Sequence, residues 1–198
     1  MDGVAGSDGR IRCAWTGIER DAQYQRYHDL EWGRPVTGES GLFERLSLEA
    51  FQSGLSWITI LRKRESFRAS FAQFDPATVA AYGPDDVERL MADASIVRNR
   101  LKINATIGNA KALLALPSGT TLGSLIAAHV PAVRPVGAPI PTQTPESQQL
   151  AKVLKKHGFS FVGPTTAYAM MQAIGVVNDH QPDCWLAADA DPAGTTQP

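Results

Sequence analysis

Short amphipathic segments, each bounded by a capping residue, a proline or a glycine, follow one another along nearly the whole chain. Asp21 and Ser56 can each cap a helix that follows them, and Pro76 and Pro84 occupy first-turn positions where proline is preferred. The helices predicted in this way cover residues 24–28, 39–52, a stretch from 57 onward, two short stretches from 76 and 84, 96–116, 122–129, 144–158 and 164–174. Sustained alternation of β-branched residues is absent from the sequence, so we expect an all-α fold.

The length and composition suit one folded domain. The chain has 198 residues, of which 43% are hydrophobic, enough to build a core. We expect residues 12–185 to form this domain, with disordered tails at 1–11 and 186–198. Four prolines between residues 130 and 143 predict a loop that joins two lobes. The N-terminus lacks a signal peptide and the apolar runs are too short for a bilayer, so we expect a cytoplasmic monomer without a membrane partner.

The chain is nearly neutral in total, but its basic residues are grouped in a few clusters. The formal net charge is −1, which argues against a strong non-specific nucleic-acid binder. Basic clusters nevertheless lie at residues 62–64, 98–102 and 152–156. Such patches can bind phosphates while the total charge stays near zero, although each cluster alone is equally typical of a solvated helix face.

A tight hairpin joins the last two predicted helices. Gly158 and Gly163 bound the turn in the sequence KKHGFSFVGPTTAYAMMQAIG, which runs from residue 155 to 175. Glycines allow positive φ angles and close approach of another backbone, and the free N–H groups of the second helix can bind phosphate. Lys155 and Lys156 lie nearby. The pattern resembles the helix-hairpin-helix element that grips a DNA backbone; an ordinary helical hairpin with a glycine stop is the alternative.

Cysteine and histidine residues near the two ends of the chain could hold a metal. His180 and Cys184 have three residues between them, a spacing that can bring both side chains to one ion. Together with Cys13 and His28 they make a closed Cys2His2 set, which predicts structural rather than catalytic zinc. The alternatives are a surface His-x3-Cys without an ion and, less favoured in a reducing compartment, a Cys13–Cys184 disulfide.

One acidic residue occurs on an otherwise apolar helix side near a group of aromatic residues. Glu49 falls on the same side of its predicted helix as Leu42 and Leu46. A buried carboxylate is costly without a partner. The partner could be an arginine or a helix N-terminus, or else a ligand with amino hydrogens held between aromatic rings. The rings available are those of Trp15, Tyr24, Tyr27, Trp32 and Trp57.

Five segments together resemble 3-methyladenine DNA glycosylase I of the constitutive bacterial type. They lie at residues 13–15 (CAW), 27–33 (YHDLEWG), 48–57 (LEAFQSGLSW), 158–163 (GFSFVG) and 177–180 (VNDH). The resemblance runs from about residue 12 to residue 184. It implies a helix-hairpin-helix glycosylase fold, with a zinc ion that tethers the N- and C-terminal lobes, and hydrolysis of the N-glycosidic bond of 3-methyladenine. Residues matching the family's zinc ligands are Cys13, His28, His180 and Cys184. Those matching its base pocket are Trp15, Tyr24, Tyr27, Glu49 and Trp57.

The implied substrate explains why one carboxylate could suffice. 3-Methyladenine in DNA is a cationic nucleoside, so its base is already activated as a leaving group and a strong general acid is dispensable. Glu49, the expected catalytic residue, can accept from the exocyclic amine and favour the cation, while the rings stack on the flipped base. The expected partner is double-stranded alkylated DNA. Its expected contacts are Gly54 and Leu55, which would fill the space left by the flipped nucleotide, and Lys155, Lys156, Gly158, Phe159 and Gly163.

The chain departs from the wider superfamily in two ways. Asn178 stands where many members carry a catalytic aspartate, and the resemblance implies that this family does without it. Residues 161–180 contain no lysine for a Schiff base, so we expect a monofunctional glycosylase without strand cleavage. The stretch 116–143 is also richer in proline than the family leads us to expect. The alternatives are a non-catalytic DNA-binding module, which needs no base pocket, and, more distantly, a zinc hydrolase of another substrate, which the closed ligand set opposes.

Overall fold

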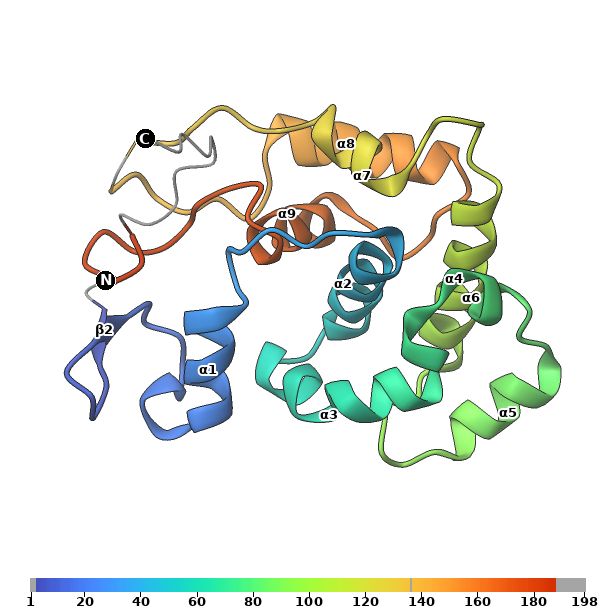
Figure 1. The fold of residues 1–198 in the computed structure, drawn as a ribbon, viewed down its shortest axis with the longest axis horizontal. Coiled ribbons are helices and arrows are strands. Elements are labelled where there is room, and N and C mark those ends of the chain that lie inside the picture. Colours follow the sequence, from blue (N-terminus) through green and yellow to red (C-terminus); the bar gives the residue numbers. More distant parts are fainter. Residues whose placement is uncertain (1–2, 136, 188–198) are drawn as a thin grey trace, which may run out of the picture.

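The computed structural model describes residues 3–135 and 137–187, and these fold mainly into helices (Figure 1). The helices are α1 (Ala22–Leu30), α2 (Glu39–Gln52), α3 (Trp57–Ser70), α4 (Pro76–Ala80), α5 (Pro84–Ala92), α6 (Arg100–Leu114), α7 (Leu122–Ala127), α8 (Pro145–Lys156) and α9 (Pro164–Ala173), with short 3-10 turns η1 (Ile18–Arg20) and η2 (Ala72–Phe74). The predicted helical fold is confirmed. No helix among the described residues is long and apolar enough to cross a membrane.

Helix α2 is the centre of the fold. It packs against α3, α6, α7 and α9 and is buried along most of its length. Figure 1 shows α2 and α9 in the middle of the molecule, with α7 and α8 on one side, α3 on the other, and α4 to α6 at one end. The largest fully buried apolar side chains of this core are Phe43, Leu46, Leu48, Phe51, Ile60, Phe67, Phe71, Phe74 and Leu90. Glu49 therefore sits on a helix that is packed against neighbours on several sides.

Side-chain caps set several helix ends where the sequence predicts them. The Asp21 carboxylate accepts from the Tyr24 backbone N–H at 2.9 Å, which starts α1. Ser56 stands at the N-cap position of α3, but its hydroxyl bonds the Thr59 hydroxyl and not a backbone N–H. Helix α6 is shorter than the predicted 96–116, because the Asn99 side chain caps it and makes Arg100 its first residue.

The N-terminal segment is ordered as a hairpin, unlike the tail expected at residues 1–11. Strand β1 (Val4–Ala5) pairs antiparallel with β2 (Ile11–Arg12). The Gly3 N–H donates to the Asp183 carboxylate at 2.5 Å, so the hairpin is held by the opposite end of the chain. Leu186, assigned to the second tail, is also buried. Residues 188–198 lie outside the described residues.

The proline-rich stretch connects helices that belong to one core. Residues 130–135 and 137–143 contain no helix or strand, as predicted. Helix α7 before them and α8 after them contact each other, and Ile126 and Leu150 belong to the same apolar cluster as α2. The expectation that this loop separates two lobes is therefore wrong. The two ends of the described part of the chain instead meet beside α1, where the segment after α9 returns (Figure 1).

Candidate active site and metal centre

A cavity of about 370 Å³ opens between α1, α2, the start of α3, α9 and the two ends of the described chain. The five residues predicted to form a base pocket all line it. The full lining comprises Cys13, Ala14, Trp15, Tyr24, Tyr27, Trp32, Glu49, Gln52, Trp57, Ile140, Ala169, Gln172, Asp179 and Gln181. A second hollow of about 340 Å³, beside α7, is lined by apolar residues and glycines and has no titratable side chain in its wall.

Aromatic rings make up one side of the cavity. Tyr24 and Tyr27 lie one turn apart on α1, and Trp57 is the first residue of α3. The Trp15 ring centroid is 5.1 Å from that of Tyr24, and the Tyr27 centroid is 5.2 Å from that of Trp57. The Trp57 indole Nε1 is buried and has no hydrogen-bond partner among the described residues. These rings offer faces on which a planar ligand can stack.

Glu49 is a buried carboxyl group with no hydrogen-bonding partner among the described residues. Its residue is 6% exposed, and none of the hydrogen bonds found in the described chain reaches its side chain. Burial raises the pKa of Glu49 to about 8, against the nearby positive charge of Arg45, which lowers it. Arg45 is not bonded to Glu49: its Nη2 donates to Glu31 at 3.2 Å, and its buried Nη1 has no hydrogen-bond partner among the described residues. The predicted alternative of a structural arginine partner therefore lacks the bond it requires.

Several cavity residues were absent from the predicted pocket. Gln52 lies three residues after Glu49 on α2, so helical spacing could have indicated it. Trp32 belongs to the predicted aromatic group but not to the predicted pocket, and it also lines the cavity. Gln172 and Ile140 come from distant segments, and no local pattern marks them as neighbours of the cavity.

An aspartate does line the cavity, one residue after the expected position. Asn178, at the expected position, is not among the residues that line the cavity. Its side-chain amide donates to the Ala187 carbonyl and accepts from the His180 N–H. Asp179 lines the cavity and is 2% exposed. Its Oδ2 accepts from the Tyr168 hydroxyl at 2.7 Å and from Gln172 Nε2 at 2.8 Å. Its Oδ1 accepts from an arginine, so both oxygens are already engaged.

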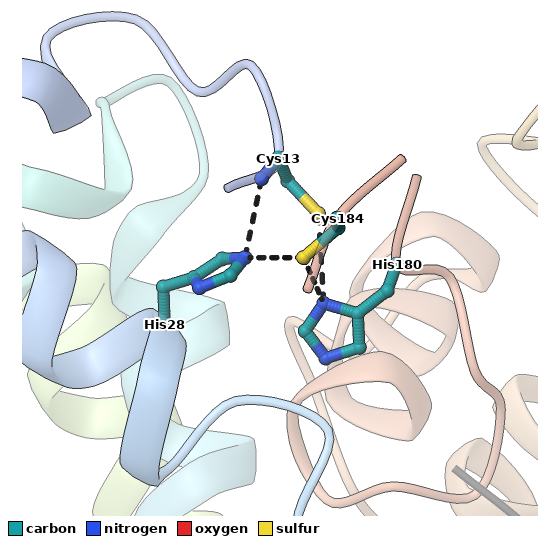
Figure 2. Close-up of side chains that lie close together, drawn as sticks. All are labelled: Cys13, His28, His180 and Cys184. Atoms are coloured by element: carbon teal, nitrogen blue, oxygen red, sulfur yellow. Dashed lines mark hydrogen bonds between the residues drawn. The ribbon is translucent and has the colours of Figure 1, made fainter. Parts of the chain in front are cut away.

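The four predicted metal ligands come together beside this cavity (Figure 2). Their ligand atoms all lie within 4.8 Å of one another. His180 Nδ1 is 3.5 Å from the sulfurs of both Cys13 and Cys184, and His28 Nε2 is 3.5 Å from Cys184 Sγ. Tetrahedral bonds of 2.0–2.3 Å require edges of roughly 3.6 Å. The donor set and its spacing therefore fit a four-coordinate metal ion.

The pKa values of the two thiols move in opposite directions. Contacts from Cys13, His180 and His28 lower the pKa of Cys184, while the neighbouring Cys184 sulfur and burial raise that of Cys13. A thiolate beside two imidazoles is the form that binds a metal.

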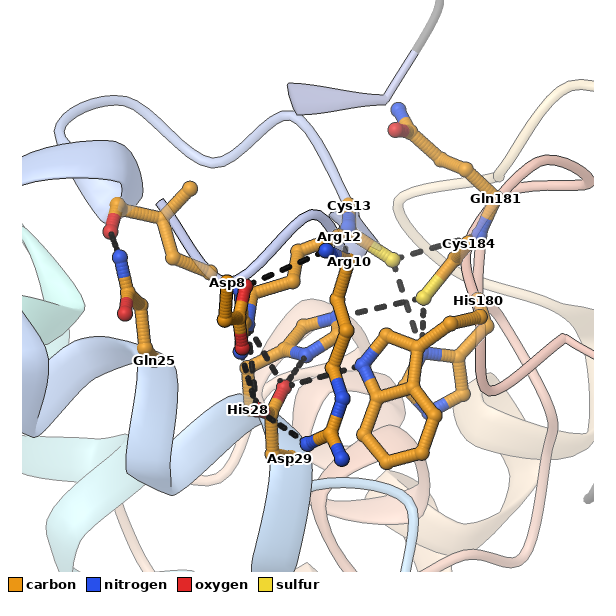
Figure 3. Close-up of polar contacts among 12 residues, drawn as sticks. Asp8, Arg10, Arg12, Cys13, Gln25, His28, Asp29, His180, Gln181 and Cys184 are labelled. Atoms are coloured by element: carbon orange, nitrogen blue, oxygen red, sulfur yellow. Dashed lines mark hydrogen bonds and ion pairs between the residues drawn. The ribbon is translucent and has the colours of Figure 1, made fainter. Parts of the chain in front are cut away.

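A layer of polar contacts orients the ligand His28 (Figure 3). Its Nδ1 lies 2.9 Å from the Asp29 carboxylate, which leaves Nε2 toward the cluster. Arg12 donates from Nε to Asp29 at 2.9 Å, and also binds Asp8, which anchors the N-terminal hairpin. Carboxylate-bound histidine is typical of metal sites. The order of the N-terminal hairpin thus follows from its position over the cluster.

The cluster and the cavity share a wall. The Trp15 ring packs edge-on against His28 with centroids 5.0 Å apart, and Trp32 packs edge-on against His180 at 4.7 Å. Gln181 accepts from the Ala14 N–H at 2.7 Å and lines the cavity. Closure of the two chain ends therefore also shapes the aromatic side of the cavity.

The hairpin at residues 158–163 joins α8 to α9 and differs from prediction in two details. Gly158 has a φ of +93°, but Gly163 has φ −83°, which any residue can adopt. Phe159 is 3% exposed and belongs to the core, so its ring is not available to DNA. Phe161 takes the exposed position, with φ +56°. Asn109 holds the hairpin by exchanging two hydrogen bonds with the Ser160 backbone, at 2.8 and 3.0 Å.

The remaining predicted contact residues are exposed on two separate turns. Lys155 and Lys156 lie in the last turn of α8, and no side chain caps the start of α9. The α2–α3 turn carries Gly54, with φ +81°, and Leu55, which is 41% exposed beside the cavity residue Trp57. Lys102 supports this turn, since its Nζ donates to the carbonyls of Phe51 and Ser53.

The fold and the site together define a mainly helical protein with an aromatic, acid-bearing cavity next to a Cys2His2 cluster. A family model described as methyladenine glycosylase matches residues 15–187. DNA-3-methyladenine glycosylase 1 of Escherichia coli strain K12 is 49% identical over 180 residues, which cover 87% of this chain and 95% of that protein. The chain belongs to the methyladenine glycosylase family.

Solved structures agree with this assignment. A crystal structure of 3-methyladenine DNA glycosylase I is 48% identical and superposes with a TM-score of 0.83, covering 88% of this chain and 98% of that one. A tyrosine-to-phenylalanine variant of 3-methyladenine DNA glycosylase I in complex with 3-methyladenine is 33% identical, with a TM-score of 0.78 over 83% of this chain and 92% of that one.

Proposed function

We propose that this protein is a base-excision repair glycosylase that hydrolyses the N-glycosidic bond of 3-methyladenine in alkylated DNA. The observation that carries the proposal is Glu49, a buried carboxyl group without a partner on the wall of an aromatic cavity. Relatives named DNA-3-methyladenine glycosylase, and a related structure bound to 3-methyladenine, support it. A binding module needs no such cavity, which disfavours the non-catalytic alternative.

The chain's residues would bind the flipped base and favour its charge. The rings of Trp15 and Trp57 stack on the base, and Glu49 accepts from its exocyclic amine. The carboxyl group is largely protonated at pH 7 in the empty cavity, because its pKa is about 8. A cationic base stabilises the carboxylate, so binding drives its ionisation. As the bond between C1′ and the base nitrogen breaks, the base keeps the bonding electron pair and leaves neutral, while water adds at C1′ and loses a proton to solvent.

The described residues that line the cavity include no lysine, so we expect the reaction to stop at base release. A lyase would attack C1′ with a lysine and form a Schiff base. Residues 161–180 contain no lysine, and Asp179 in the cavity wall has both oxygens engaged. The protein should therefore act as a monofunctional glycosylase.

The DNA contacts would come from the two exposed turns. The uncapped start of α9, with Lys155 and Lys156 nearby, would bind backbone phosphates without reading sequence. Leu55, exposed on the α2–α3 turn beside Gly54, would fill the gap left in the duplex. The turn is adjacent to Trp57, so the filled gap and the held base would be neighbours.

The metal at the Cys2His2 cluster would be one zinc ion with a structural role. Two thiols and two imidazoles form the donor set that zinc prefers, and four protein ligands leave no position for water. When bound, the ion would fix the two chain ends against each other. It would contribute to the reaction only through the shape of the cavity.

Base release from methylated DNA, resolved by base identity, tests the proposal. Adenine offers an amino group to Glu49, whereas guanine offers a carbonyl, so we expect efficient release of 3-methyladenine and little of 7-methylguanine. Glu49→Gln keeps an amide oxygen but loses the charge, and it should lower activity at least tenfold, or roughly 1.4 kcal/mol. Glu65→Gln, at a side chain 78% exposed on α3, is the matched control and should leave activity unchanged. Equal release of both bases, or full activity in Glu49→Gln, would contradict the proposal.

A further inference from the structure

One arginine in the proline-rich connection links this connection to the wall of the base cavity. Arg134 donates to Oδ1 of the buried Asp179 from Nε at 3.2 Å and from Nη2 at 2.5 Å. Its third nitrogen, Nη1, donates to the carbonyl of Ala138. The planar guanidinium of Arg134 thus binds both Asp179 in the cavity wall and the backbone at Ala138. Lysine cannot reproduce this fork geometry.

The chain held in this way carries an apolar side chain into the cavity. Ile140 lines the cavity two residues after Ala138, although it is 45% exposed and belongs to no helix. Ile140 is absent from the apolar core clusters of the described residues. Packing within these clusters therefore does not account for its position, whereas the bond from Arg134 to Ala138 anchors the backbone two residues before it.

The anchor is built into the cavity wall rather than resting on the surface. Asp179 is 2% exposed, and its other oxygen is held by Tyr168 and Gln172 of α9. Gln172 lines the cavity, and its amide must direct its NH2 group to the carboxylate, which is an acceptor only. The Arg134 side chain is 23% exposed and its ion pair with Asp179 is mostly shielded from solvent. Such a pair keeps its geometry better than an exposed one.

We propose that Arg134 is a positioning residue that holds Ile140 as the aliphatic wall of the base cavity, where it contacts an N-alkylated purine and limits entry of water. The proposal rests on the proposed function, since it assigns a contact to the same bound base. In the wild-type protein the bound base would cover the partly exposed Ile140 side chain. Removing this side chain should therefore weaken binding of the base. Removing the guanidinium should have a similar effect without touching the base.

Binding of free 3-methyladenine tests this chain of contacts. We expect Ile140→Ala and Arg134→Met each to raise its Kd about five- to tenfold. If both act through one contact, the double variant should bind no more than about twofold weaker than the worse single variant. Arg134→Lys keeps the charge opposite Asp179 but loses the fork, and should lie in between. Arg100→Met removes a charge that pairs with Glu88 between α6 and α5, the helices that lie at the opposite end of the molecule from α1 in Figure 1, and should bind as wild type.

A measurement without ligand or DNA separates this inference from the proposed function. Trp15, Trp32 and Trp57 line the cavity, so opening it should increase the quenching of tryptophan fluorescence by acrylamide. We expect stronger quenching in Arg134→Met and Ile140→Ala than in wild type and Arg100→Met. If Arg134→Met does not fold, Arg134→Lys and Ile140→Ala decide. Unchanged quenching, unchanged affinity in Ile140→Ala, or additive effects in the double variant would each overturn the proposal. A wild-type protein that bound no base but showed the quenching difference would refute the proposed function alone.

Discussion

Glu49→Gln should make the protein more stable above neutral pH even though it impairs base release. The pKa of the wild-type carboxyl group rises from 4.5 to about 8 on folding because of burial. The free energy of unfolding is therefore not reduced by Glu49 below about pH 4.5, where the group is protonated in both states. It falls as the pH rises through about 8, because only the unfolded state lets the group ionise freely. Glutamine has the same shape and cannot ionise, so the variant escapes that loss.

The size of the effect follows from the same pKa. At about 1.4 kcal/mol for each tenfold change in proton affinity, the difference between 4.5 and about 8 amounts to roughly 5 kcal/mol. Water that enters the adjoining cavity reduces this cost, so we expect a gain of about 2–4 kcal/mol at pH 8.5. At pH 5 the two proteins should differ by less than about 1 kcal/mol from this cause.

Urea unfolding of both proteins at pH 5, 7 and 8.5 measures the difference directly. Only the pH dependence of that difference matters, because metal ligands and other groups titrate equally in both proteins. Glu65→Gln, at an exposed side chain, should give a difference that does not change with pH. A flat difference for Glu49→Gln, or a variant that becomes relatively less stable at high pH, would show that the Glu49 carboxylate has a stabilising partner and that our account of its pKa is wrong.

Three further outcomes are expected. Purified protein should contain about one zinc per chain. Cys184→Ser should lower the free energy of unfolding by roughly 3–5 kcal/mol, or the Tm by about 10 °C, and should lower activity at permissive temperature less. A folded, active protein without metal in elemental analysis would contradict this. DNA affinity should fall steeply with added salt. Asn109→Asp places a carboxylate next to the Ser160 carbonyl, and it should weaken binding to all DNA sequences alike in a filter-binding assay. Affinity equal to wild type would refute the prediction that the 158–163 hairpin binds DNA. Borohydride should trap no covalent complex with DNA, since residues 161–180 lack lysine; a trapped complex would exclude a monofunctional enzyme.

The helices could be predicted from sequence because their signals are local. Asp21 and Thr144 cap helices through their own side chains, and Pro76 and Pro84 begin helices as their fixed φ favours. The five aromatic and acidic residues of the expected pocket do line one cavity, and the four expected ligands do meet. For these sets the family resemblance supplied what helical spacing alone left open.

The features that escaped prediction depend on contacts between distant residues. The N-terminal hairpin is polar and glycine-rich and looked disordered, but Arg12 binds Asp29 from the next helix and orders it. Residues 137–143 have no periodicity, so nothing local indicated that Ile140 reaches the cavity. Phe159 was assigned to the DNA surface from its place in a turn, while the turn's geometry directs it into the core and exposes Phe161 instead.

The Cys2His2 cluster joins residues that are made at very different times during synthesis. Cys13 and His28 leave the ribosome early, while His180 and Cys184 follow only after all nine helices of the described chain have been made. The hairpin at residues 158–163 and the central core can form before that point, since their contacts do not involve the cluster. The aromatic side of the cavity cannot, because Gln181 and the walls around Trp15 need both ends of the chain. An incomplete or truncated chain should therefore bind DNA without releasing a base. Contact between the two ends of the described chain would then be the last step of folding that activity requires.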